Sequence, residues 1–353
     1  MENERIRKGN IKSSFKSKNN KKMRIITLEE HYATPAFIKG PGKHLKNPDR
    51  ASAANSPLIA SRPNLAHQLM DIGSGRIAEM DEAGINMQVL SLTSPGVEQL
   101  NATEALKIAR DANDHLADAV CQYPDRFAGL AALPTTSPDT AVEELEHLVR
   151  EHDFKGAVIN GHIHGRYLDD EFFWPIMERA EALQVPIYLH PTLPLQPVIE
   201  NVYKGNYSMD VTSMFAAAAW GWHIETATHV LRIILSGAFD KYPHLQLVIG
   251  HLGEALPFML QRIDNTLPRE LTKLDRPIGD YLRENIHYTF SGFNYIPPFL
   301  NLFLQVGADR IMFSSDYPYS SMKSAYTFLD QLPVSAADKE KIAHLNAERI
   351  LRL

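Results

Sequence analysis

The sequence is poor in cysteine and lacks long apolar runs. Cys121 is the single cysteine among 353 residues, so no disulfide can form within the chain and no cysteine cluster can hold zinc. Any metal must therefore be held by His, Asp or Glu. No apolar run approaches the roughly 20 residues that a membrane span needs, and no secretory leader begins the chain. These absences predict a soluble, cytoplasmic protein that does not bind membranes.

Positive charge is concentrated at the start of the chain. Residues 1–22 carry eight Lys or Arg against Glu2 and Glu4, with few apolar residues, which predicts a disordered basic tail. The whole chain has a formal net charge of −6, so the remainder is acidic and no nucleic-acid surface is expected on it. The tail is a native extension, an expression leftover, or an arm for targeting or polyanion binding, and Met23 is a sensible alternative start.

The order of the expected elements indicates the fold class. No Gly-x-Gly-x-x-Gly follows any candidate strand, which argues against a dinucleotide-binding open sheet. From Met23 onward, short apolar runs alternate with longer helical patterns, as in repeated βα units around a parallel sheet. We therefore expect an α/β fold, a (β/α)8 barrel forming one domain over residues 23–353. The expected strands are Arg24–Leu28, Met87–Leu92, Phe127–Leu133, Gly156–Ile159, Pro186–Leu189, Gln246–Ile249, Ile286–Phe290 and Arg310–Phe313.

Helices and one long loop are expected between these strands. Apolar residues recur every three or four positions, and Ser137 and Asp170 are typical helix-start residues. Residues 40–63 lack periodicity and follow the first strand, where a barrel carries active-site loops, so we expect a lid or an oligomer contact there. The clearest predicted helices are Thr103–Gln122, Thr140–Glu151, Asp170–Leu183 and Glu254–Asn265.

Polar side chains end three of the expected strands. Alternation along the first strand would place Glu29 and His31 on the same side, facing the barrel interior. His190 closes an apolar strand before a proline, and Asp316 follows the last strand. Each signal has a plainer explanation: an exposed charge cluster, a structural histidine, or an N-cap for the next helix at Asp316. Because strand ends of a barrel meet on one face, their convergence favours a site for one divalent metal, Zn²⁺ or Mn²⁺.

Further candidates follow other strands. His251 comes after a strand, and Glu254 lies three residues on, where one helical turn would let it orient His251. His162 and His164 could line the pocket, whereas His223 and His229 lie on a probable helix and are less informative. Arg232 interrupts an apolar stretch, so it either reaches the surface or binds an anion in the pocket.

These strand ends together resemble the amidohydrolase superfamily, within it the branch of aminocarboxymuconate semialdehyde decarboxylase and the hydroxybenzoate decarboxylases. The resemblance runs from about Met23 to the C-terminus. Most amidohydrolases begin with His-x-His, whereas the segment Leu28-Glu29-Glu30-His31 is similar to the Glu-x-His of γ-resorcylate and 5-carboxyvanillate decarboxylases. The segments Tyr188–Pro191, Gly250–Glu254 and Phe313–Pro318 also match the family pattern.

The resemblance implies roles for these residues. The metal ligands would be Glu29, His31, His190 and Asp316. Asp316 would also donate the proton, while His251, oriented by Glu254, would hold or deprotonate a phenolic oxygen. The implied contacts to an aromatic acid are Arg232, His164, Phe293 and Tyr317.

The expected activity is the nonoxidative decarboxylation of an ortho-hydroxybenzoate, such as 2,6- or 2,3-dihydroxybenzoate, to a phenol and CO2, reversible with bicarbonate. Relatives that form dimers and tetramers imply a homodimer or homotetramer. The main alternative is a metal-dependent hydrolase, such as a lactonase, on the same barrel. A third hypothesis is a catalytically silent barrel that senses an aromatic acid.

Overall fold

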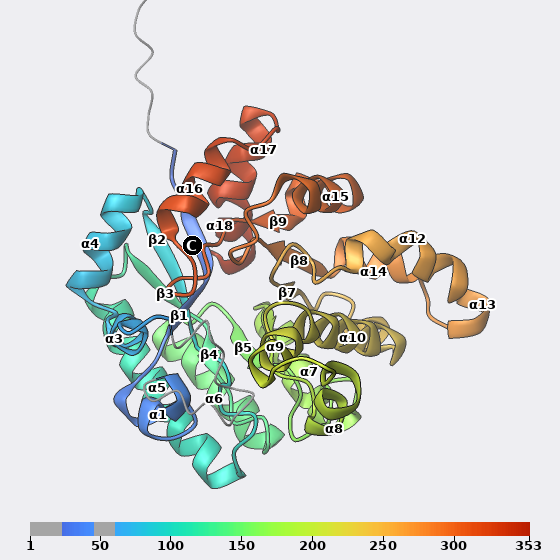
Figure 1. Cartoon of the computed structure of the whole chain (residues 1–353), viewed down its shortest axis with the longest axis horizontal. Coiled ribbons are helices and arrows are strands. Elements are labelled where there is room, and N and C mark those ends of the chain that lie inside the picture. The colour runs from blue at the N-terminus through green and yellow to red at the C-terminus, as the bar shows by residue number, and fades with distance from the viewer. Residues whose placement is uncertain (1–22, 46–60) are drawn as a thin grey trace, which may run out of the picture.

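Parallel strands wound into a closed ring form the centre of the computed structural model, which describes residues 23–45 and 61–353 (Figure 1). All strand pairs are parallel, and the strands are buried on both faces, which confirms the expected α/β barrel. The strands are β1 (Ile26–Tyr32), β2 (Met87–Leu92), β3 (Phe127–Gly129), β4 (Ala131–Ala132), β5 (Ala157–Asn160), β6 (Ile187–His190), β7 (Leu247–Ile249), β8 (Ile286–Thr289) and β9 (Ile311–Met312).

The third barrel strand is interrupted at Leu130. We predicted one strand over Phe127–Leu133, but β3 pairs with β2 and β4 pairs with β5. Leu130 N donates to Leu90 O on one side, and Ala131 N donates to Gly156 O on the other. The chain therefore changes its partner within one barrel position, and the two short strands join the two sheets.

The ring closes where β1 meets β9. Leu28 N donates to Phe313 O at 3.1 Å, and Leu28 also forms a parallel bridge with Ser314. Inside the ring, alternate strand residues such as Ile26, Leu28 and Val89 pack together as a separate apolar cluster. The C-terminal helix α18 (Asn346–Leu351) adds Leu351 to this cluster, so the end of the chain closes one end of the barrel.

Helices surround the ring, and α5 (Ala102–Gln122), α6 (Pro138–His152) and α7 (Trp174–Leu183) lie where they were predicted. The side chain of Asp170 caps the turn before α7 by accepting from Phe172 N, and Ser137 holds the N-cap position of α6. The other helices are α1 (Pro35–Lys39), α3 (Leu65–Met70), α4 (Ser74–Ala83), α8 (Gln196–Val198), α9 (Met209–Ala216), α10 (Gly221–Leu235), α11 (Ala238–Lys241), α12 (Leu256–Thr266), α13 (Arg269–Thr272), α14 (Ile278–Glu284), α15 (Ile296–Val306), α16 (Met322–Asp330) and α17 (Ala336–Glu340).

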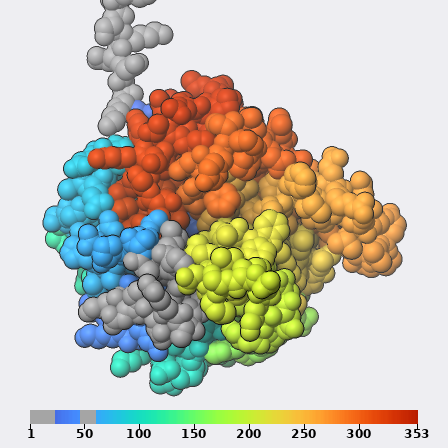
Figure 2. All heavy atoms as spheres, in the orientation of Figure 1, coloured from blue at the N-terminus to red at the C-terminus, as the bar shows by residue number. Residues whose placement is uncertain are grey.

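Two predicted features lie wholly or partly outside the described residues. These are the basic tail at 1–22 and the central part of the 40–63 loop, residues 46–60. Within the described part, no helix has the length and apolar character needed to cross a bilayer. α12 and α13 stand out from the rest of the surface (Figure 2).

Candidate metal centre and active site

Glu29 and His31 meet at the end of β1, although not through regular alternation. The pairing of β1 with β2 shifts register between Thr27 and Glu30, and Glu29 has a φ of 63°. This bulge turns the backbone at Glu29, a conformation that costs a non-glycine residue about 1–2 kcal/mol. The prediction that the two side chains converge is therefore right in its outcome, but the sequence period alone does not explain it.

His190, the last residue of β6, completes a buried cluster with Glu29 and His31. Candidate ligand atoms of the three side chains all lie within 4.8 Å of one another. His190 Nε2 lies 3.4 Å from Glu29 Oε1, and the rings of His31 and His190 meet edge to face with centroids 4.9 Å apart. Two imidazoles and a carboxylate from two different strands thus point into one small volume.

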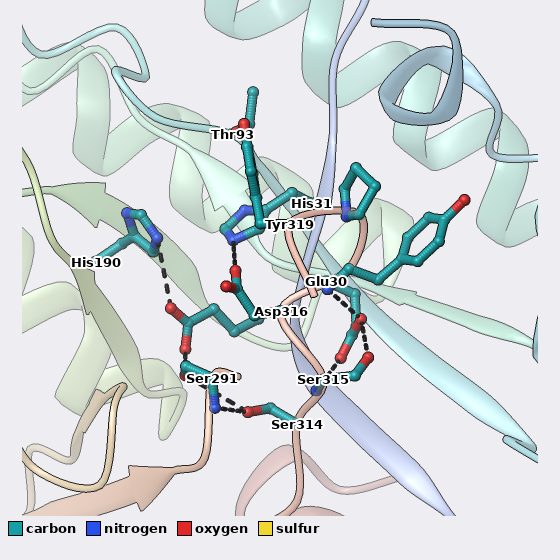
Figure 3. A network of polar contacts seen from close by, with 12 residues as sticks. Glu30, His31, Thr93, His190, Ser291, Ser314, Ser315, Asp316 and Tyr319 are labelled. Atoms are coloured by element: carbon teal, nitrogen blue, oxygen red, sulfur yellow. Dashed lines mark hydrogen bonds and ion pairs between the residues drawn. The ribbon is translucent and has the colours of Figure 1, made fainter. Parts of the chain in front are cut away.

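Asp316 adjoins this cluster from the loop after β9. Its Oδ1 lies 3.2 Å from His31 Nε2, as Figure 3 shows. Asp316 does not cap the next helix, because Ser321 does so by accepting from Ser324 N at the start of α16. Like Glu29, Asp316 has a positive φ, 61°. The loop therefore aims the carboxylate at the cluster rather than at a helix terminus.

The hydrogen bonds of Glu29 test whether the cluster suits a cation. Its Oε2 accepts from the hydroxyls of Tyr188, Thr289 and Ser291. Its Oε1 is buried, and among the described residues no group donates to it. A buried carboxylate oxygen that lacks a donor and faces imidazole nitrogens is stabilised by a positive ion. The donor set fits a divalent metal held by Glu29, His31, His190 and Asp316.

Burial perturbs the ionisation of these side chains in the same direction, toward neutrality. It raises the pKa of Glu29 well above its usual value, helped by the nearby Asp316 charge, and raises the pKa of Asp316 to about 7. Burial also lowers the pKa of His31 to about 3 and that of His190 well below its usual value. Neutral imidazoles offer lone pairs, and a divalent cation would favour both ionised carboxylates.

Gly250 makes room for this arrangement. A Cβ at this position would lie 2.6 Å from Glu29 Oε2 and 2.8 Å from Ser291 Oγ. Any larger residue after β7 would therefore push against the hydroxyl that holds Glu29. This explains the glycine just before His251 in the sequence.

A second cluster consists of His251, Glu254 and His223. Glu254 Oε1 accepts from His251 Nδ1 at 2.7 Å, and its Oε2 accepts from His223 Nδ1 at 2.5 Å. His251 also faces the first cluster, since its Nε2 lies 4.0 Å from Glu29 Oε1. The predicted contact between His251 and Glu254 is present.

The route by which Glu254 reaches His251 differs from the prediction. We expected a helix from Glu254, but α12 begins at Leu256, and all five residues from His251 to Ala255 have positive φ. A tight turn of this hand, rather than one turn of a right-handed helix, brings the two side chains together. It follows β7 directly and keeps both groups at the barrel rim.

Charges balance within the second cluster. Burial of Glu254 opposes its ionisation, but the attraction of His251 and His223 outweighs burial and lowers its pKa to about 2. Burial likewise opposes protonation of His223, yet Glu254 raises the pKa of that imidazole. His223, which comes from α10, was not singled out because its place on a helix gives no hint of this contact.

Of the predicted substrate contacts, Phe293 lies closest to this machinery. Its ring meets His223 and His251 edge to face, with centroids 5.2 and 5.3 Å away. Tyr317 instead packs under the Arg76 guanidinium, 4.8 Å from the ring centroid, so we withdraw it as a substrate contact. The nearby Tyr319 lies next to the cluster instead: its ring lies 5.3 Å from that of His31, and its hydroxyl forms a hydrogen bond with Thr93 Oγ1 at 2.7 Å.

Arg232 and His164 face other partners. The Arg232 guanidinium is about half exposed and binds both oxygens of Asp169, so the surface alternative describes it, and we no longer assign it to the pocket. His164 is exposed and donates to Leu100 O. His162 is buried beside Gln99, whose Nε2 donates to the His162 carbonyl.

Comparison with known proteins identifies the family. The amidohydrolase family profile matches residues 62–353. A γ-resorcylate decarboxylase from a Polaromonas species is 37% identical over 93% of this chain and 98% of its own length. The chain belongs to the amidohydrolase family.

Solved amidohydrolase structures share the whole barrel. A 2,6-dihydroxybenzoate decarboxylase complexed with 2,6-dihydroxybenzoate is 35% identical, with a TM-score of 0.81 over 94% of this chain and all of the other. The Polaromonas dihydroxybenzoic acid decarboxylase, solved with bound manganese and 2-nitroresorcinol, is 37% identical, with a TM-score of 0.83 over 94% and 97% of the two chains. The 5-carboxyvanillate decarboxylase of Sphingomonas paucimobilis is 34% identical, with a TM-score of 0.84 over 94% and 99%.

The amidohydrolase site contains further residues that sequence reasoning missed. Tyr188, Thr289 and Ser291 bind Glu29 from β6 and from the end of β8. Tyr188 lies between aliphatic residues in a buried strand. A hydroxyl group at such a position was the sequence feature that could have pointed to its role. Glu30 was also missed, although it lies between two predicted ligands.

Proposed function

We propose that this amidohydrolase removes CO2 nonoxidatively from an ortho-hydroxybenzoate of the 2,6- or 2,3-dihydroxybenzoate class and releases the phenol. The observation that supports this most is the position of Asp316, a carboxyl group with a pKa near 7, beside the buried cluster of Glu29, His31 and His190. Such a group can hold a proton at neutral pH next to a cation site. The names and ligands of the relatives point to the same reaction.

Manganese is the metal we propose first, because the Polaromonas relative was solved with it, and zinc is the second candidate. A bound divalent cation would act as a Lewis acid and orient the substrate carboxylate and its ortho oxygen. Glu29, His31, His190 and Asp316 would hold it. With two carboxylates and two neutral imidazoles, the donor set would neutralise the charge of the ion.

The protein's own groups would move the protons. Asp316 would take up a proton from solvent when the substrate anion enters the site and donate it to the ring carbon that bears the carboxylate, so the C–C bond breaks without leaving an electron pair in the ring plane. The electrons of the broken C–C bond restore the aromatic ring as CO2 leaves. Asp316 is then ionised again and takes its next proton from solvent. His251, oriented by Glu254, would accept the phenolic proton and raise the electron density at the ring carbon. Phe293 would form one wall for the ring.

Assembly and compartment complete the proposal. Phe258 of α12 and Leu304 of α15 are 79% and 81% exposed, respectively, and apolar side chains on this scale favour a homodimer or homotetramer. We place the enzyme in the cytoplasm, in keeping with its single cysteine. Light scattering of the purified chain tests the assembly.

The decisive experiment is ultraviolet-monitored turnover of mono- and dihydroxybenzoates by the purified protein with Mn²⁺ or Zn²⁺. We expect loss of 2,6- or 2,3-dihydroxybenzoate, appearance of the matching phenol, and the reverse carboxylation in concentrated bicarbonate. Folded, metal-loaded protein that turns over no hydroxybenzoate would refute decarboxylation. Lactone hydrolysis by that sample would then establish the hydrolase alternative.

A further inference from the structure

Glu30 lies between Glu29 and His31 in sequence but serves a different part of the site. It is fully buried, and its carboxylate is directed at the loop that follows β9, as Figure 3 shows. A buried carboxylate in a strand needs several donors to remain in place. The partners of Glu30 therefore show what this residue holds.

The donors come from both sides of Asp316. Glu30 Oε1 accepts from Ser315 N at 2.8 Å. Glu30 Oε2 accepts from Ser315 Oγ at 2.7 Å and from Tyr317 N at 3.1 Å. Gln88 Nε2 donates to the same oxygen at 3.3 Å. One carboxylate thus binds the backbone of the residue before Asp316 and of the residue after it.

The segments joined in this way are both in unusual conformations. Glu29 and Asp316 have φ values of 63° and 61°, and His31 N donates to Tyr317 O at 2.8 Å. Residues in this region of conformational space persist only where their surroundings fix them. Glu30 fixes the peptide groups that flank Asp316. It lies in sequence between Glu29 and His31, two of the proposed metal ligands.

We propose that Glu30 is a positioning residue, which sets the Asp316 carboxylate relative to Glu29 and His31 by binding the peptide groups on both sides of Asp316. This rests on the proposed function, since it assigns Glu30 to the same metal and proton-transfer site. Both oxygens of the Glu30 carboxylate accept from protein groups, so we assign Glu30 an effect through Asp316 and no contact with the substrate. Its loss should therefore loosen the metal site and slow turnover while leaving substrate binding nearly unchanged.

Glu30→Gln is the sharpest variant. The glutamine side chain has almost the same shape but only one acceptor oxygen, whereas backbone N–H groups point at both oxygens of Glu30. Either orientation of the amide therefore places an N–H₂ group against one backbone N–H. The variant breaks the link beside Asp316 without opening a cavity.

Glu98→Gln is the matched control. Glu98 is also a fully buried glutamate at the barrel rim, where it accepts from Asn160 N at 2.8 Å. Burial raises the pKa of both Glu30 and Glu98 to about 7, so the two substitutions remove comparable groups. None of the hydrogen bonds of Glu98 within the described residues reaches residues 315–317. A general cost of replacing a buried carboxyl group by an amide should therefore appear in Glu98→Gln as well.

The test compares manganese binding by calorimetry, kcat and KM in the two variants and in the unaltered chain. We expect Glu30→Gln to bind Mn²⁺ about 10- to 100-fold more weakly, as for other groups that orient metal ligands, and to lower kcat by a similar factor at saturating metal. Its KM should stay within about threefold, and Glu98→Gln should leave manganese affinity and kcat within about twofold. Unchanged manganese affinity in folded Glu30→Gln, or an equal loss in Glu98→Gln, would overturn the proposal.

Ser315→Ala serves as a milder variant if Glu30→Gln does not fold. It removes only the hydroxyl donor to Glu30, and we expect manganese affinity to fall about three- to tenfold; no change would again overturn the proposal. Calorimetry needs no turnover. If the unaltered chain turns over no hydroxybenzoate, the proposed reaction fails, while the affinity comparison still decides the role of Glu30.

Discussion

The two polar clusters at the barrel mouth differ in how their charges are balanced. Glu29 and Asp316 lie beside neutral imidazoles, and burial raises the pKa of both carboxyl groups. Glu254 lies between His251 and His223, and its pKa falls to about 2 although it is fully buried. The first cluster therefore needs a cation from outside the protein to ionise fully, whereas the second supplies its own.

This difference separates the two proposed functions of the site, which are metal binding and the orientation of His251. A carboxylate pair that lies beside neutral imidazoles, and whose ionisation burial opposes, favours a bound metal ion, whereas a carboxylate already bound to two imidazoles orients them instead. Three His or Glu side chains meet in each cluster, so residue types alone do not distinguish them. The hydrogen bonds do, because in the described part of the chain no group donates to Glu29 Oε1, whereas each oxygen of Glu254 accepts from an imidazole.

Removing the metal should have the largest effect. We expect chelation to reduce turnover to background and Mn²⁺ to restore it, with one metal ion bound per chain. At 100 times its dissociation constant, the ion should stabilise the fold by about 2.7 kcal/mol, measurable as a higher melting temperature. Metal analysis that finds two ions per chain would show that the second cluster is not balanced internally.

Asp316→Asn should come next. An amide cannot donate the proton and is a poor metal ligand, so kcat should fall by about 10²- to 10⁴-fold or more. The melting temperature of the metal-free protein should change little, because the substitution removes a carboxyl group whose ionisation burial opposes. Full activity of Asp316→Asn in the hydroxybenzoate assay would exclude Asp316 as the acid.

Glu254→Gln should lower kcat as Glu30→Gln does, but without the loss of manganese affinity. We expect kcat to fall about 10- to 100-fold, because His251 loses its charged partner, while manganese affinity stays within about threefold. Calorimetry and steady-state kinetics on the same preparation measure both quantities. A large loss of manganese affinity would mean that the two clusters form a single unit.

Manganese affinity should weaken as the pH falls below 7. Asp316, with a pKa raised to about 7, is protonated below that pH in the metal-free protein and must lose its proton to bind the ion. Each proton displaced weakens binding by up to about tenfold per pH unit, whereas His31, with a pKa near 3, stays neutral. Titrations at pH 6, 7 and 8 test this, and equal affinities would contradict the raised pKa of Asp316.

Arg232→Ala should have the smallest effect. The guanidinium is half exposed and bound to Asp169. Its loss should therefore lower the free energy of unfolding by at most about 1 kcal/mol and leave kcat/KM within about twofold. A strong rise in KM for hydroxybenzoates would return Arg232 to the pocket.

The sequence predicted the site correctly where a polar residue directly follows a buried strand. The positions of Glu29, His31, His190 and Asp316 follow from the barrel, because parallel strands deliver their ends to one face. The contact between His251 and Glu254 was also found, although the expected helix from Glu254 was wrong. The five residues 251–255 all have positive φ, but only one of them is glycine, so no pattern in the sequence predicts this turn.

What the sequence did not reveal depends on contacts between distant segments. Glu30 and Ser315 are 285 residues apart, and no local pattern links them. His223 belongs to an ordinary amphipathic helix, and its partner Glu254 lies 31 residues further along the chain. The sequence left two positions open for Arg232, at the surface or in the pocket, because its ion pair with Asp169 is visible only in the structure.

The closure of β1 on β9 also bears on synthesis of the chain. β1 is made long before its partner Phe313 and the helix α18 that closes the barrel. At roughly 5–20 residues per second, β1 waits on the order of tens of seconds for them. During that time Glu29 and Glu30 have neither of their last neighbours, Ser291 and Ser315. The candidate metal centre can therefore form only after the segment around Asp316 has left the ribosome.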